Sequence, residues 1–112
     1  MRRSRTVGLF GTGTRTRVLL TLAMLERTYA SELARILKAN VSLVQKALAS
    51  LETAGVIVGS VEGRQRTYSL NPRSPYRKEL TQLLERLATL DVPLQKRIAE
   101  TRRRPRRAGK EL

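Results

Sequence analysis

The chain has 112 residues, enough for one domain with a modest hydrophobic core. Hydrophobic residues make up 40% of it and charged residues 29%, and the formal net charge is +14, so phosphate backbones and anionic surfaces are the expected partners. No apolar run approaches the roughly 20 residues of a membrane-spanning helix, and Val7-Gly8-Leu9-Phe10 is too short for the apolar region of a signal peptide. We therefore expect a cytoplasmic, nucleoid-associated protein without membrane contact.

Cysteine and histidine are both absent from the sequence. Disulfides and thiol switches are thereby excluded, and the usual ligands of softer transition metals are missing. The usual general base and the usual soft nucleophile are missing too, and the carboxylates are dispersed. Gly11-Thr12-Gly13 lacks the further glycines of a nucleotide-binding loop. We predict no enzyme activity, no cofactor and no metal site.

The chain is predicted to begin with a flexible arm, a helix and a short β-prone stretch. The basic arm covers residues 1–13, where glycines lower helix propensity. A helix should run from about residue 14 to 27, because apolar residues recur there at helical spacing without Gly or Pro. Residues 28–30 are β-prone and are expected to lie beside a later hairpin.

A helix-turn-helix is predicted next. One helix covers about residues 31–38, Asn40 caps the second, and the second runs from 41 to about 53, before Gly55. A helix fits the major groove of B-DNA, where glutamine can pair with adenine and lysine with guanine or a phosphate. The candidate DNA contacts are Asn40, Val41, Ser42, Gln45, Lys46 and Ala49. The alternative is that they form only the solvated side of an amphipathic helix.

A two-stranded hairpin, or wing, should follow. The first strand spans residues 56–61, the turn lies at Glu62-Gly63, and the second strand continues to about Asn71, before Pro72. Arginines at such a tip can follow phosphates or enter a narrow minor groove. The candidate DNA contacts are Arg64, Gln65 and Arg66. Alternatively, these residues only protect a solvated hairpin edge.

A helix over about residues 75–90 is predicted after the wing, with Ser74 as N-cap and Pro75 at its first position. Leucines recur along it at helical spacing and favour a dimer interface, the alternative being a core within the chain. They are Leu80, Leu83, Leu84, Leu87 and Leu90. A short helix is expected within residues 91–101.

Basic residues are also concentrated at the two ends of the sequence. Residues 102–112 contain hardly anything apolar to bury and are predicted to be disordered in the free protein. Arms of this kind add affinity for DNA through counterion release without reading its sequence, although a solubility tail is the alternative. The candidate phosphate contacts are Arg2, Arg3, Arg5, Arg102, Arg103, Arg104, Arg106 and Arg107.

Three motifs in order resemble the winged helix-turn-helix transcription regulators of the ArsR/MarR type. They are Ser31-Glu32-Leu33-Ala34, the segment 47–57 (ALASLETAGVI) and the segment 63–70 (GRQRTYSL). The resemblance covers about residues 9–90. Four shorter motifs further resemble a prokaryotic ArsR-like subgroup, whose winged domain sometimes occurs next to or fused with a nucleotidyltransferase-like domain. These motifs are Leu9-Phe10-Gly11, Leu70-Asn71-Pro72, Pro75-Tyr76 and Glu79-Leu80.

The resemblance implies a mostly α fold with a small antiparallel β hairpin, in which residues 14–90 form the winged domain and about 75–90 its dimerisation helix. Family members bind operator DNA as two-fold dimers through the recognition helix and the wing. The positions carried over are Ser42, Gln45, Lys46, Arg64 and Arg66. Metal-sensing members use Cys, His or acidic clusters, and this chain has neither Cys nor His.

The predicted function is therefore that of a transcription regulator that binds specific double-stranded DNA, acting as a repressor in a homodimer. One alternative is an architectural protein that coats DNA without sequence choice. Another is a winged-helix module that docks onto a partner protein. RNA binding is less favoured, because the four aromatic residues form no cluster in the sequence.

Overall fold

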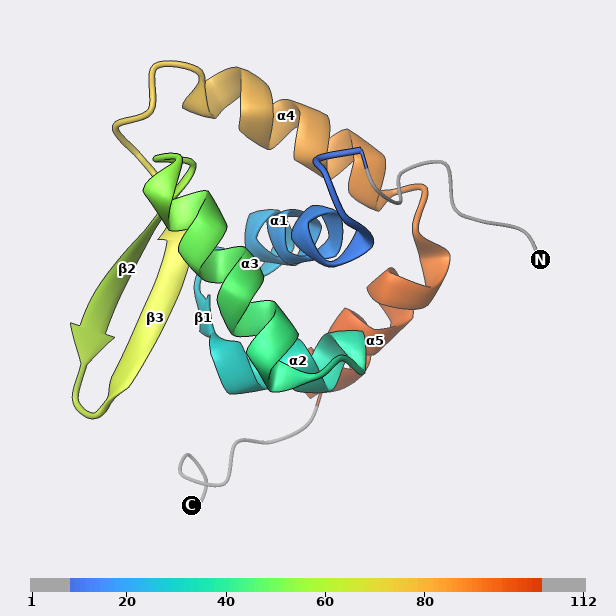
Figure 1. The fold of residues 1–112 in the computed structure, drawn as a ribbon. Coiled ribbons are helices and arrows are strands. Elements are labelled where there is room, and N and C mark those ends of the chain that lie inside the picture. Colours follow the sequence, from blue (N-terminus) through green and yellow to red (C-terminus); the bar gives the residue numbers. More distant parts are fainter. Residues whose placement is uncertain (1–8, 104–112) are drawn as a thin grey trace.

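The computed structural model describes residues 9–103, which form five helices and a three-stranded antiparallel sheet (Figure 1). Helix α1, Gly13–Leu25, is capped by Thr12, whose hydroxyl accepts a hydrogen bond of 3.0 Å from the backbone N–H of Arg15. In Figure 1, α1 lies at the centre of the molecule, with other helices around it. Because α3, α4 and β3 all pack against it, α1 buries residues on several sides.

The helix-turn-helix consists of α2, Ala30–Leu37, and α3, Val41–Thr53. The side chain of Asn40 caps α3 by accepting a hydrogen bond of 2.8 Å from the backbone N–H of Ser42. At the other end, Gly55 has φ +78°, a left-handed conformation that glycine adopts without strain after a helix. The predicted bounds and cap of the recognition helix are thus confirmed.

The wing consists of β2, Ile57–Glu62, and β3, Gln65–Leu70. Glu62 still pairs with Gln65, so the two-residue loop is Gly63-Arg64, with φ +63° at Gly63. The turn predicted at Glu62-Gly63 was therefore one residue too early, because Glu62 stays in the ladder. Gly63 supplies the positive φ that a tight hairpin loop requires at its first position.

A third strand, β1, Thr28–Tyr29, completes the sheet in the order β1-β3-β2. It pairs antiparallel with β3 through Thr28↔Tyr68 and Tyr29↔Thr67. The prediction of a β-prone stretch beside the wing is confirmed. Only the inner part of the wing belongs to a three-stranded sheet, since β1 is so short.

The helix after the wing is shorter than predicted: α4 is Arg77–Ala88, preceded by Tyr76 at the cap position without a side-chain hydrogen bond. The predicted start at Ser74 and Pro75 was wrong. The backbone carbonyl of Ser74 accepts a hydrogen bond of 3.0 Å from the N–H of Arg77, and its hydroxyl has no hydrogen-bond partner among residues 9–103. Residues 71–76 therefore form turns before the helix begins.

The last helix, α5, Val92–Arg103, is longer than the one predicted within residues 91–101. Buried Asp91 precedes it and accepts a hydrogen bond of 3.2 Å from the backbone N–H of Leu94. Leu94 and Ile98 pack into the core, which explains why the helix persists.

The backbone of Arg102 and Arg103 lies in α5, which corrects the prediction of disorder from residue 102. The other candidate basic residues of the two ends lie outside the described residues; they are Arg2, Arg3, Arg5, Arg104, Arg106 and Arg107.

The leucines of the predicted dimer interface divide into two groups. Leu84 is fully buried, and Leu80 and Leu87 are half-buried against the core. Leu83 and Leu90 are 44% and 59% exposed. The interface prediction was therefore wrong for Leu84, because α4 packs onto α1 and turns this leucine into the chain's own core. No helix of the described region is long and apolar enough to cross a membrane.

Candidate nucleic-acid interface

The recognition helix α3 has one buried and one exposed face. Its apolar face is buried against α1 and α2; it comprises Val44, Ala47, Leu48 and Leu51. The exposed residues near its start and middle are Val41, Ser42, Leu43, Gln45, Lys46 and Ala49. All members of this helix that were predicted from the sequence as DNA contacts are thus on the solvent side. Val41 and Leu43, two apolar residues near the helix start that could touch thymine methyl groups if exposed, are 43% and 54% exposed.

Asn40 and Ser42 are engaged with each other at the start of α3. Besides capping the helix, the side-chain oxygen of Asn40 accepts a hydrogen bond from the hydroxyl of Ser42. Both residues are exposed. The hydrogen bonds of Asn40 and Ser42 stabilise the N-terminal turn of α3. Gln45 and Lys46 are therefore the longer polar side chains on this face that remain available for contact with DNA.

The two wing arginines lie in different environments. Arg64 is exposed in the hairpin loop and forms no ion pair with any residue of the described range 9–103. Arg66 forms an ion pair with Glu52 of α3, with Nη2 and Oε2 2.5 Å apart. The hydrogen bond and the charge of Glu52 raise the pKa of Arg66 above its ordinary value. Arg64 and Gln65 are thus presented to solvent, whereas Arg66 is tied to the recognition helix.

A second ion pair ties the wing to the segment after α1. Arg27 donates a hydrogen bond to the carboxylate of Glu62, the last residue of β2. Sequence reasoning missed both ion pairs that tie the wing to the rest of the fold, Arg27–Glu62 and Glu52–Arg66. Glu62 adjoins the turn glycine, but nothing local in the sequence indicates which cation it would meet.

The candidate interface combines α3 with the wing beside it. Figure 1 shows the hairpin of β2 and β3 projecting beyond the helices, with α3 beside its base. The Glu52–Arg66 ion pair joins the C-terminal part of α3 to β3. A rigid helix with exposed polar residues next to a projecting basic hairpin is the arrangement with which winged helices contact duplex DNA.

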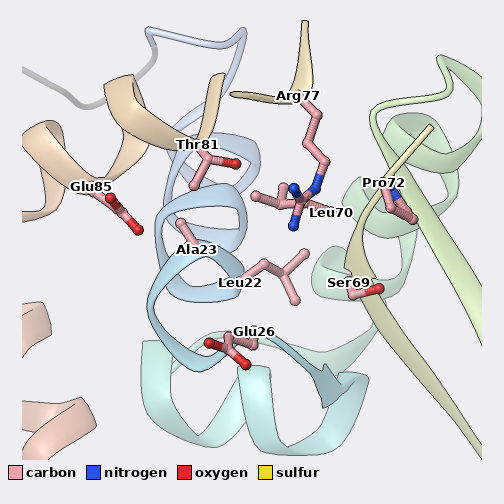
Figure 2. Close-up of a pocket in the computed structure, with 9 residues that line it drawn as sticks. All are labelled: Leu22, Ala23, Glu26, Ser69, Leu70, Pro72, Arg77, Thr81 and Glu85. Carbon is pink, nitrogen blue, oxygen red and sulfur yellow. The ribbon is translucent and has the colours of Figure 1, made fainter. Parts of the chain in front are cut away.

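A hollow of about 450 Å³ lies apart from this surface, between α1, the end of β3 and α4. Figure 2 shows Arg77 reaching into it from the start of α4, Glu26 at the end of α1, and Glu85 on α4. No residue of α3 or of the hairpin loop lines this hollow. Across residues 9–103, no three potential metal-ligating side chains of the Asp, Glu, His or Cys type come together.

No protein-family model and no curated protein matches the sequence. Among solved structures, the chain is similar to the adhesin competence repressor AdcR from Streptococcus pyogenes, with a TM-score of 0.59 and 19% identity over 80% of this chain and 66% of that chain. It is also similar to a single-site mutant of Lactococcus lactis ZitR, with a TM-score of 0.59 and 20% identity over 90% of this chain and 64% of that one. A double mutant of ZitR in apo form gives a TM-score of 0.56 and 24% identity, over 80% and 76% of the two chains.

These likenesses, together with the element order, define the class of the molecule as a winged helix-turn-helix fold. The predicted fold class is confirmed. The chain spans 66% of AdcR and 64% of the single-site ZitR mutant, so both neighbours contain residues without a counterpart here. At identities of 19–24%, the likeness establishes the fold and nothing more specific.

Proposed function

We propose that this protein binds specific sites on duplex DNA and regulates transcription as a repressor, in the form of a homodimer. The observation that carries the proposal is the exposed face of α3, which bears Gln45 and Lys46, in a helix that lies beside the base of the basic wing. The net charge of +14 supplies non-specific attraction to the phosphate backbone. The likeness of the fold to a protein named as a repressor adds support.

The DNA contact proposed for each residue follows from the chemistry of its side chain. Gln45 can form two hydrogen bonds with adenine in the major groove, and Lys46 can meet guanine or a phosphate. Arg64 at the wing tip can follow a phosphate or enter the minor groove. The basic ends add affinity that depends on salt and carries no sequence information. A dimer bound in this way would block polymerase sterically.

The proposal is tested by selecting binding sites from a pool of random duplexes and sequencing the winners. A two-fold dimer should enrich an inverted repeat, with half-sites about one DNA turn, roughly 34 Å, apart. Enrichment of a single half-site would support specific binding by a monomer and contradict the homodimer. The absence of any enriched motif would contradict specific regulation.

The exposed leucines of α4 and of its C-terminal turn are the proposed dimer contacts. We expect the double variant Leu83→Glu/Leu90→Glu to be monomeric in sedimentation analysis, because two charges cannot be buried unpaired between protomers. The matched control Gln82→Glu adds a charge at an exposed neighbouring position and should remain dimeric. If the double variant stays dimeric, the dimer interface does not include Leu83 and Leu90, and this assignment is wrong.

Loss of the wing-tip charge should change the salt dependence of binding. We expect Arg64→Gln to reduce the slope of log affinity against log salt by about 0.9 per protomer, the value for one phosphate contact. Fluorescence anisotropy at several salt concentrations measures this slope. The control Arg73→Gln removes an exposed arginine at the opposite end of β3, far from the loop, and should leave the slope unchanged. Equal slopes for wild type and Arg64→Gln would exclude a phosphate contact by Arg64.

An architectural protein that coats DNA is the second candidate, favoured by the same net charge of +14. Such a protein would bind all duplexes with similar affinity and with a steep dependence on salt. The selection experiment distinguishes it, because coating enriches no motif.

A further inference from the structure

The outer part of the wing has little support from the sheet. Strand β1 pairs only with Thr67 and Tyr68 of β3, which lie opposite Ser60 and Gly59 of β2, so residues 61–66 nearer the loop form a hairpin of two strands. An isolated two-stranded hairpin is marginally stable in water and would not hold a fixed direction by itself. Side-chain contacts outside the sheet must therefore set the angle between the wing and the helices.

The side chain of Arg66 crosses from the wing to the recognition helix. Arg66 pairs with Val61 across the ladder, and its side chain runs back diagonally over Gly59 of β2. A Cβ atom placed on Gly59 would lie only 2.7 Å from Nε and Nη2 of the guanidinium. The guanidinium therefore occupies the space that the missing side chain of Gly59 leaves open.

Two partners hold the guanidinium of Arg66 in that space. Its Nη2 lies 2.5 Å from Oε2 of Glu52 on α3, and its Cζ lies 5.7 Å from the ring centroid of Tyr68 on β3. A planar guanidinium suits both a carboxylate and an aromatic face, so the two contacts fix its direction as well as its position. The outer wing is thereby linked to the last turns of the recognition helix.

We propose that Arg66 is a positioning residue that sets the angle of the wing against α3, and that Arg64 is the wing's contact with DNA. The inference rests on the proposed function and reassigns one of its candidate DNA contacts. If Arg66 turned to a phosphate, it would leave the carboxylate of Glu52 unpaired near a polyanion. Holding the wing in place before binding also lowers the entropy lost when helix and wing engage their grooves together.

The variant Gly59→Ala separates positioning from direct contact, because it displaces Arg66 without changing any charge. Gly59 does not adopt a left-handed φ, so alanine fits the backbone, and the three atoms nearest to its Cβ all belong to the guanidinium of Arg66. If Arg66 positions the wing, affinity for the selected site should fall by about fivefold, since the wing must be ordered on binding. If Arg66 contacts DNA, its release should leave the affinity unchanged or raise it, and the inference would be wrong. Ser60→Ala, on the other face of β2, is the control and should behave as wild type.

A charge swap provides the second test. Arg66→Glu alone should weaken binding, and the double variant Glu52→Arg/Arg66→Glu should bring affinity back to within about twofold of wild type by restoring the ion pair. Glu52→Arg alone measures any new contact of that arginine with DNA. A double variant as weak as Arg66→Glu would show that position 66 itself needs a cation against DNA, which contradicts the positioning role.

Amide hydrogen exchange in the free protein tests the same inference without DNA. Residues 61–66 should exchange faster in Gly59→Ala than in wild type, whereas Arg64→Gln should leave their exchange unchanged. Unchanged exchange in Gly59→Ala would refute the positioning role whatever the DNA experiments give. Faster exchange combined with a failed site selection would refute the proposed function and leave the role of Arg66 in the wing standing.

Discussion

Replacing Leu84 with alanine is expected to lower the free energy of unfolding by about 2–5 kcal/mol, the usual cost of truncating a fully buried leucine. Leu84 has no exposed surface and joins the core where α4 packs onto α1. Alanine is a good helix former, so the loss would come from packing and not from the helix itself. Urea unfolding followed by circular dichroism measures the effect.

Leu83→Ala is the matched control for this experiment. Leu83 adjoins Leu84 in the same helix but is 44% exposed, so its truncation should cost far less stability of the single chain. Unfolding at two protein concentrations separates the core from a dimer interface. A loss for Leu84→Ala that appears only at low concentration would place this leucine between protomers and contradict its role in the core.

Replacing Gln45 with alanine is expected to weaken binding to the selected site by about 1–3 kcal/mol, the discrimination typical of a good bidentate base contact. Gln45 is exposed in the second turn of α3, whereas Val44 and Leu48 of the same helix are buried. Its loss should also relax the preference at one base pair of the site. Anisotropy titrations against the site and its single-base variants measure both effects.

Gln82→Ala is the control for Gln45→Ala, because Gln82 is an exposed glutamine of α4, outside the recognition helix and the wing. It should leave affinity and base preference unchanged. If Gln45→Ala lowers the affinity for specific and random DNA equally, Gln45 does not read a base and contacts the backbone at most.

The helix-turn-helix and the hairpin could be predicted because their signals are local. Asn40 before an apolar helical pattern and Gly55 after it mark the two ends of α3. Gly63 between two β-prone runs marks the hairpin to within one residue. Exposure of Gln45 and Lys46 follows directly from the helical spacing of the buried residues.

The rest depended on contacts between distant parts of the sequence. A leucine stripe shows that a helix has an apolar face, but not whether its own chain or a second copy covers that face, and here α1 covers Leu84. The pairing of Arg66 with Glu52 arises only when β3 lies beside α3. The start of α4 was misplaced because the turns between Asn71 and Arg77 use the backbone carbonyl of Ser74 instead of its hydroxyl.

The measurement that tests the central claim most directly is a comparison of affinities for the selected duplex and for a random duplex, at near-physiological salt, by fluorescence anisotropy. Specific recognition by α3 and the wing predicts that the selected site binds about 10³-fold or more tightly than random DNA. Equal affinities that both fall steeply with salt would contradict the account and indicate a protein that coats DNA through charge alone.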